Sequence, residues 1–329
     1  MTALAPVLEA FFTEGLCQQR AASPNTIAAY RDTFRLVLRF AQQKLGKAPS
    51  DLLLTDLDAD FVGAFLQHLE RDRGNSARTR NARLAAIRSF FRFAAPREPA
   101  QAAVAQRVLA IPQKRTDHKV VSYLTREELG ALLAAPDTTT WIGRRDHTLM
   151  LVAAQTGLRV SELVELRVDQ IIRGPGAHVR CRGKGRKERA TPLTRETLKA
   201  LRQWLRERGG APQDAVFPSL RGGPLSRDAV ERRLAKYALI ASKKCPALRD
   251  RRVTPHILRH TTAVHLLQAG VDCAMIALVL GHESIATTQI YLEADLATKE
   301  KALARAGPLP ARPRRYRPAD RLLAFLESL

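Results

Sequence analysis

The first third of the chain has apolar residues at helical spacing, interrupted by helix-capping signals. Ser23, followed by a proline, is an N-cap signal for a helix that stops at Gly46. The same spacing predicts two more helices over 58–74 and 76–95. These elements indicate a helical N-terminal domain, which we place at residues 1–97.

The predicted helix over 76–95 has an apolar face and a basic face. Its apolar positions recur every three or four residues, at Leu84, Ile87, Phe91 and Ala94. Arginines gather on an adjoining face, at Arg78, Arg88 and Arg92. The aromatic residues Phe90, Phe91 and Phe93 occupy packing positions and need not stack on bases. This helix can therefore pack inward and hold phosphates outward.

The helical pattern weakens between Pro96 and Ser122, where prolines and mixed charges are typical of a linker between domains. We place this linker at 98–122. A second pattern begins with Thr125 and Glu128, which form a capping box.

The second domain, placed at 123–306, combines helices with a small sheet. An apolar helix runs through 147–156 and ends at Gly157, and short alternating pieces separated by glycines over 166–192 predict strands. Further helices are predicted over 194–208, 226–241, 255–268, 272–280 and 284–305. The fold class is therefore mainly α with a small antiparallel β-sheet, in two domains.

The last segment, 307–329, is rich in proline and arginine and then becomes amphipathic. A short helix on such a tether often docks on another surface. A neighbouring subunit and the chain's own domain both stay open as that surface.

The chain is strongly basic, and its positive charge is concentrated in a few segments. The 329 residues carry 54 Lys and Arg against 32 Asp and Glu, a formal net charge of +22. Nearly all of it lies in 71–97, 173–208 and 243–259, with net charges of +7, +9 and +5. Because neutralised phosphates release counterions, basic segments from both halves favour double-stranded DNA as partner over mere solvated helix faces. The 45% hydrophobic content excludes disorder as the main state.

Export and metal binding find no support in the sequence. No run of 18 apolar residues occurs, and Glu9 and Glu14 interrupt any signal peptide. We therefore expect a cytoplasmic, nucleoid-associated protein without a membrane partner. The four cysteines are scattered without a CxxC pair, so they predict neither a zinc cluster nor a disulfide framework.

Four short clusters carry candidate chemistry. They are TGLRVSEL at 156–163, RGKGRKER at 182–189, TPHILRHT at 254–261 and LGHESIATTQIY at 280–291. His256 and Arg259 lie three residues apart near a helix start, where free amide groups also favour an anion. Arg159 follows the helix-ending Gly157 and can project from a turn as a second planar donor.

Each cluster also has a plainer interpretation. Arg259 could form an ion pair at the edge of the core, and His256 and His260 could be a helix pair or, with less support, metal ligands. No HExxH sequence or carboxylate at ligand spacing supports a metal site. The 182–189 cluster lacks a GxxxxGK[ST] pattern, so it is not a P-loop, and a generic basic hairpin is the alternative.

In their order along the chain, the clusters resemble the tyrosine recombinase (phage integrase) family. The shared features are the arginine of TGLRVSEL, a lysine in a glycine-flanked turn, HxxRH, LGH, and a tyrosine nine residues after that histidine. The resemblance covers most of 123–306. The N-terminal region is similar to that family's helical, SAM-like core-binding domain, through weaker motifs.

The resemblance implies a role for each matching residue. The implied set is the nucleophile Tyr291, the phosphate clamp Arg159 and Arg259, the acid Lys184 for the departing 5′ oxygen, the general acid/base His256, the supporting His282 and the structural Glu162. A phenol with a free pKa of about 10 needs a nearby base, and charge building on the phosphate needs donors, so these residue types suit the reaction.

The implied activity is site-specific cutting and rejoining of DNA through a 3′-phosphotyrosyl bond and a Holliday junction. In this family the ester energy is kept, so no metal, ATP or other cofactor is expected. Four protomers would act together, as a homotetramer or with a related recombinase. The basic residues expected to hold DNA are Arg78, Arg80, Arg83, Arg88, Arg92, Arg182, Arg186, Lys187, Lys243 and Lys244.

Three features of this sequence differ from those usual in Xer-type recombinases and bear on the subtype. Xer-type recombinases usually continue with Thr-His after the tyrosine, whereas this chain reads LEADLATKEKAL. A basic insertion at 242–253 and the tail after Gly307 are two further departures. Together they favour an integrase or transposase of a mobile element over a Xer-type resolvase of chromosome or plasmid dimers. A type IB topoisomerase-like relaxing enzyme and a non-catalytic DNA-binding protein are the remaining alternatives.

Overall fold

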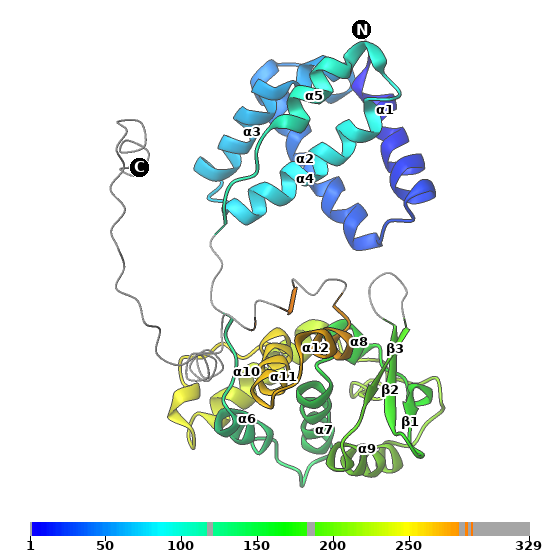
Figure 1. Ribbon diagram of the computed structural model, residues 1–329, viewed down its shortest axis with the longest axis vertical. Helices are drawn as coiled ribbons and strands as arrows, with labels where there is room; N and C mark the ends of the chain where they lie inside the picture. Colours follow the sequence, from blue (N-terminus) through cyan, green and yellow to red (C-terminus); the bar gives the residue numbers. More distant parts are fainter. Residues whose placement is uncertain (1, 117–120, 183–187, 283–286, 289–290, 292–329) are drawn as a thin grey trace, which may run out of the picture. The chain divides into compact units, whose positions relative to one another are not determined.

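The computed structural model describes residues 2–116, 121–182, 188–282, 287–288 and 291 (Figure 1). The chain divides into two compact units, Met1–His118 and Lys119–Leu329. The first is helical and the second combines helices with a three-stranded antiparallel sheet, so the predicted fold class is confirmed. Within the described part of the chain, no helix is long and apolar enough to cross a membrane.

The helices of the first unit begin and end largely where the capping signals predict. They are α1 (Leu4–Ala10), which continues as a π-helix over Phe11–Gln19, α2 (Pro24–Leu45), α3 (Ala59–Arg71), α4 (Ala77–Ala94) and α5 (Ala102–Ala110), with short 3-10 turns at Pro49–Asp51, Leu54–Leu57 and Pro99–Gln101. The Ser23 side chain accepts a hydrogen bond from the amide of Thr26, and α2 ends at Gly46 with φ +68°. α3 stops at Arg71, three residues before the expected Gly74.

Aromatic rings fill the centre of this unit. Phe11, Phe34 and Phe90 meet there with ring centroids 5.3 to 6.1 Å apart. The predicted apolar stripe of α4 is buried at all four positions. Phe90 and Phe91 are fully buried as well, so their assignment to the core is confirmed.

The stretch expected to be a linker contains α5, which packs in the first unit. Its residues Ala105 and Val108 are buried in the same core as α4. The linker interpretation is therefore wrong for residues 102–110. Small alanines dominate this segment, so its apolar face is narrow and its helical period is weak in the sequence.

The second unit places a small sheet beside a group of helices. The helices are α6 (Arg126–Leu133), α7 (Trp141–Thr156), α8 (Val160–Val164), α9 (Arg195–Arg208), α10 (Arg227–Ala241), α11 (Pro255–Gln268) and α12 (Cys273–Leu280), with 3-10 turns at Val168–Gln170 and Pro246–Leu248. The strands β1 (Ile171–Ile172), β2 (His178–Arg182) and β3 (Glu188–Pro192) pair in that order, with Val179 opposite both Ile171 and Thr191. The predicted sheet is thus confirmed.

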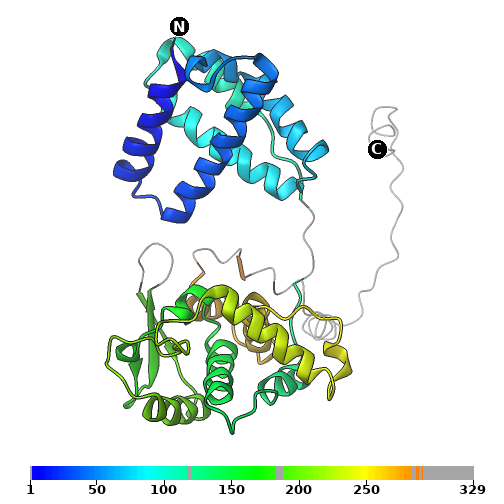
Figure 2. The same ribbon diagram turned by 180° about the vertical axis from the view of Figure 1, so that it is seen from behind.

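Packing in this unit brings the four motif clusters to one place. α7 packs against α9 and α11, and α12 packs against both α11 and β3. Figure 2, the view from behind, shows α10, in yellow-green, crossing in front of the other helices of this unit. The predicted helix over 284–305 and the amphipathic segment 307–329 lie outside the described residues, except for helical residues 287, 288 and 291.

Candidate active site

The first arginine of the site is presented by a tight turn between two helices. α7 ends at Gly157, whose φ is +61°, and Arg159 is the N-cap residue of α8. A Cβ at position 157 would lie 2.3 Å from Leu280 Cδ2. Glycine is therefore required here both for the left-handed backbone and for the close approach of the end of α12.

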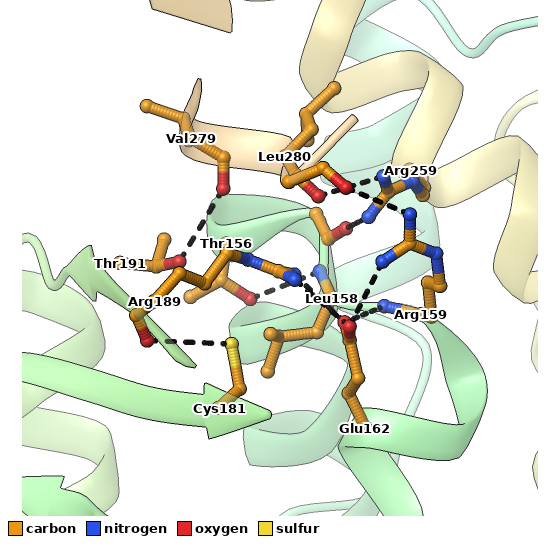
Figure 3. Close-up of polar contacts among 12 residues, drawn as sticks. Thr156, Leu158, Arg159, Glu162, Cys181, Arg189, Thr191, Arg259, Val279 and Leu280 are labelled. Carbon is orange, nitrogen blue, oxygen red and sulfur yellow. Dashed lines mark hydrogen bonds and ion pairs between the residues drawn. The ribbon is translucent and has the colours of Figure 1, made fainter. Parts of the chain in front are cut away.

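Glu162, on α8, holds two arginines at once (Figure 3). Its carboxylate accepts a hydrogen bond from Arg159 Nη1 at 3.0 Å and two from Arg189, from Nη1 at 2.9 Å and Nη2 at 2.8 Å. It also accepts one from the Arg159 amide at 2.8 Å. Burial raises the pKa of Glu162, but the hydrogen bonds from Arg189 and the Arg159 amide outweigh it, so the pKa is lowered. The carboxylate is therefore ionised and holds the two arginines in place.

Arg259 is anchored by backbone carbonyl groups. Its Nη1 donates to the carbonyl of Gly157 at 2.6 Å and its Nη2 to the carbonyl of Leu280 at 2.8 Å (Figure 3). The side chain is buried, with the residue 3% exposed. Burial, followed by the nearby Arg159, lowers the pKa of Arg259 to about 10, so it stays a cation at neutral pH.

The end of α12 binds both arginines of the predicted clamp. Arg159 Nη2 donates to the carbonyl of Gly281 at 2.9 Å, one residue after the carbonyl that Arg259 contacts. Gly281 closes α12 in the left-handed conformation, with φ +66°. Carbonyl groups at the end of a helix have no hydrogen-bond partner within the helix and otherwise bind water. Here two of them accept hydrogen bonds from the two guanidinium groups and so orient them.

His282 follows this turn and lies beside the tyrosine. Its Nδ1 is 2.7 Å from Thr288 Oγ1, and its ring is nearly parallel to that of Tyr291, with centroids 6.1 Å apart. Burial, and then Arg259 and Arg159, lower the pKa of His282 to about 4. The ring is therefore neutral at pH 7.

Tyr291 is buried at the centre of these groups. The residue is 2% exposed, and its Oη lies 3.0 Å from His260 Nδ1. Burial raises the pKa of its phenol, while Arg259 and Arg159 oppose that rise. The hydroxyl is therefore protonated in the structure.

The structure brings together six of the seven residues singled out from the sequence: Arg159, Glu162, His256, Arg259, His282 and Tyr291. His256 is solvent-exposed near the start of α11, with its ring centroid 4.6 Å from that of His260. Burial of part of the ring, followed by Arg259 and Arg159, lowers its pKa. Lys184 lies outside the described residues.

Two contributors to this arrangement were missed by the sequence argument. Arg189 occupies the last position of the 182–189 cluster, where it reads as one more basic residue of a hairpin. It shares one face of the sheet with the buried Thr191, two residues later on β3, and lies opposite the buried Cys181 on β2. The two-residue spacing from Thr191 is the signal that the sequence offers. The sequence shows that His260 lies one helical turn after His256, but its position against Tyr291 follows only from the fold.

Among the residues expected to hold DNA, the seven whose side chains the structure describes fall into two groups. Arg78, Arg92, Lys243 and Lys244 are exposed. Three others bind inside the first unit: Arg80 to Glu70 and the Pro112 carbonyl, Arg83 to Thr33 and the Ala29 carbonyl, and Arg88 to the Ile111 carbonyl. These contacts give the second group an internal structural role. The side chains of Arg182, Arg186 and Lys187 lie outside the described part.

Comparison with known proteins extends these observations over the whole chain. Residues 122–297 match the phage integrase family, and residues 10–98 match the phage integrase N-terminal SAM-like domain. The chain is 56% identical over 326 residues to y4rC of Sinorhizobium fredii (strain NBRC 101917 / NGR234), which is named as an integrase/recombinase. That match covers 99% of this chain and 98% of the relative.

A second relative is the tyrosine recombinase XerC of Myxococcus xanthus, 34% identical over 302 residues, with 89% of this chain and 94% of the relative covered. Among solved structures, the XerH site-specific recombinase bound to a palindromic difH substrate has a TM-score of 0.69 and 22% identity. That match covers 88% of this chain and 82% of XerH. It shows that the fold is shared.

Proposed function

The chain belongs to the phage integrase family of tyrosine recombinases, and from this we propose that Arg159, Arg259 and Tyr291 form its reaction centre. The protein is a site-specific recombinase, an enzyme that cuts and rejoins DNA. The geometry of the site supports our assignment of that activity to particular side chains.

One observation carries the assignment: the cluster has more positive than negative charge. Three guanidinium groups, from Arg159, Arg189 and Arg259, meet there, and Glu162 is the one carboxylate among the described residues that contacts them. Arg259 has carbonyl groups as its partners, which satisfy its hydrogen bonds without neutralising its charge. A buried cation without an opposite charge is unfavourable. A phosphodiester anion supplies the missing charge, next to the hydroxyl of Tyr291.

The chemistry follows from these positions. Arg159 and Arg259 would donate to the nonbridging oxygens, where charge builds as Tyr291 Oη attacks phosphorus. The new bond joins Oη to phosphorus, and the bond from phosphorus to the 5′ oxygen breaks. In our proposal His256 takes the phenol proton and Lys184 gives a proton to the departing oxygen. One ester replaces another, so the reverse reaction rejoins the strand.

The DNA surface and the assembly complete the proposal. We assign residues 1–97, together with α5 packed in the same core, as the core-binding domain, 123–306 as the catalytic domain and 307–329 as a docking tail. The exposed Arg78, Arg92, Lys243 and Lys244 are our candidates for phosphate contacts. The XerH structure contains its difH substrate, which supports a DNA duplex as the partner of this chain. Strand exchange between two duplexes would take four protomers.

The test is DNA cleavage by arginine variants. Arg259→Ala and Arg159→Ala should each cut a nicked duplex roughly 10²–10³-fold more slowly at saturating DNA, because each removes donors from the transition state. Arg259→Lys keeps the charge but not the planar fork, and reports whether geometry matters. Arg167→Ala, which removes an exposed arginine paired with Asp169, is the control. Undiminished cleavage by folded Arg259→Ala would contradict the proposed centre.

We further propose that the recombinase serves a mobile element. Its 56% identity to the integrase/recombinase y4rC, over nearly the whole of both chains, supports this over the 34% identity to XerC. A Xer-type resolvase is the second candidate because that match also spans most of both chains. Cleavage at the ends of the surrounding element, and not at the chromosomal dimer-resolution site, is expected. The opposite preference would favour the second candidate.

A further inference from the structure

His260 lies against the hydroxyl of Tyr291, and no role in the reaction proposed above uses it. Its Nδ1 is 3.0 Å from Tyr291 Oη. The two rings meet edge to face, with centroids 5.4 Å apart and an interplanar angle of 62°. On its other side His260 contacts His256, one helical turn earlier on α11. The ring of His260 is therefore held between a candidate nucleophile and a candidate acid/base.

The hydrogen bond has a definite direction. A buried phenol needs an acceptor for its proton, because an unsatisfied buried donor is costly. Among the described residues, His260 Nδ1 is the hydrogen-bond partner of Tyr291 Oη. Burial, followed by His256 and Arg259, lowers the pKa of His260 to about 4, so its ring is neutral at pH 7 and has one free acceptor nitrogen. Tyr291 Oη therefore donates and Nδ1 accepts.

We propose that His260 is a positioning residue for the nucleophile: its Nδ1 accepts the hydrogen bond of the Tyr291 hydroxyl and fixes the direction in which Oη faces the phosphate. His282, nearly parallel to the Tyr291 ring on another side, limits tilting of the ring. Fixing both ring and hydroxyl favours one orientation of the attacking lone pair. Such orientation matters because a misplacement of about 1 Å can cost about 10²-fold in rate.

His260 is assigned as an acceptor that orients, and not as the base that removes the proton. The phenol has a pKa raised above 10, whereas that of the imidazole is about 4. Full transfer of the proton from the phenol to this imidazole is therefore strongly unfavourable. His256 and Arg259, both on α11, also disfavour a positive charge on the His260 ring. The proton must therefore leave by way of another group.

The inference rests on the proposed function and is tested with two variants of the full chain. His260→Leu removes the acceptor, and His260→Asn places an amide oxygen close to the position of Nδ1. The probe is a nicked duplex carrying the joined ends of the surrounding element, on which a covalent complex accumulates. We expect His260→Leu to form that complex about 100-fold more slowly. His260→Asn should stay within about tenfold of wild type, since it keeps the hydrogen bond.

Two further readouts separate positioning from other roles. DNA affinity, from gel shifts, should be the same for all three proteins, and tryptophan fluorescence should show that each is folded. The pH dependence of cleavage should be shared by wild type and His260→Asn.

Equal losses in folded Leu and Asn variants would overturn the inference, because an amide cannot replace a base or an imidazole needed for packing. Full activity of His260→Leu would overturn it as well. Wild-type protein that forms no covalent complex on this duplex or on one carrying the chromosomal dimer-resolution site would contradict the proposed function itself.

Discussion

The carboxylate of Glu162 holds two neighbouring arginines in position. It receives three guanidinium hydrogen bonds and one amide hydrogen bond, so its oxygens are well satisfied although it is buried. Arg159 and Arg189 are held by this shared carboxylate, and Arg259 by carbonyl groups. Glu162 therefore fixes the positions of two arginines. Arg259 leaves the site with a positive charge that no carboxylate in the described part of the chain neutralises.

This arrangement predicts the effect of Glu162→Gln on stability. The amide leaves two partly buried arginines without their carboxylate, so we expect a loss of about 2–4 kcal/mol in the free energy of unfolding at pH 7. Urea titrations can follow it through tryptophan fluorescence, because both tryptophans, Trp141 and Trp204, lie in the second unit. Glu165→Gln, at an exposed position on the same segment, should change stability by less than about 0.5 kcal/mol.

The same pair of proteins has a signed pH dependence. The pKa of Glu162 is lower in the folded state than its ordinary value of 4.5, so its contribution is fully present above pH 4.5. It is lost as the pH falls through the folded pKa. The difference between wild type and Glu162→Gln should therefore shrink below pH 4.5. A constant difference down to pH 3 would contradict the role given to this carboxylate.

At the scale of elements, helix ends do most of the positioning. Arg159 begins α8, His256 and Arg259 lie in the first turns of α11, and the end of α12 supplies two carbonyl acceptors. These ends meet because Gly157 lets the turn after α7 touch Leu280.

Gly157→Ala tests this close approach. The left-handed backbone should cost about 1–2 kcal/mol and the clash with Leu280 about 1–3 kcal/mol more. Gly176→Ala is the matched control, with φ +68° and open space around its Cβ, so it should show the first cost alone. Urea titration of both variants compares them. Equal losses at the two positions would mean that the contact with Leu280 is unimportant.

The sequence predicts these elements well where local signals decide them. Ser23, Thr125 and Gly157 mark helix ends by side-chain capping or by backbone conformation, and the structure confirms all three. α5 was missed because alanines give a weak period. The contact between His260 and Tyr291 depends on packing between residues 31 positions apart, which no local pattern encodes.

At the scale of the whole molecule, charge governs the partner. The net charge of +22 is concentrated in segments from both units, as binding along a DNA duplex would require. The structure refines which of these charges are free to bind. On α4, Arg80, Arg83 and Arg88 fasten the helix to its own unit, whereas Arg78 and Arg92 are exposed.

Salt dependence of DNA binding tests this division. Replacing both Arg78 and Arg92 by alanine should reduce the slope of log affinity against log salt by about 0.9 for each lost phosphate contact. Arg35→Ala, an exposed position beside Leu8 and Phe12, is the control and should leave the slope unchanged. Fluorescence anisotropy at several salt concentrations measures the slopes. Equal slopes for the double variant and wild type would show that neither arginine contacts a DNA phosphate.

The most direct measurement is the chemical identity of the protein–DNA bond. A nicked duplex with the element's ends would be incubated with the protein, the complex digested, and the nucleotide-bearing peptide sequenced by mass spectrometry. We predict a 3′-phosphate on Tyr291, a free 5′ hydroxyl on the released strand, and no adduct with Tyr291→Phe. An adduct on another of the five tyrosines, or a bond through a 5′-phosphate, would contradict the assignment of Tyr291 as the nucleophile.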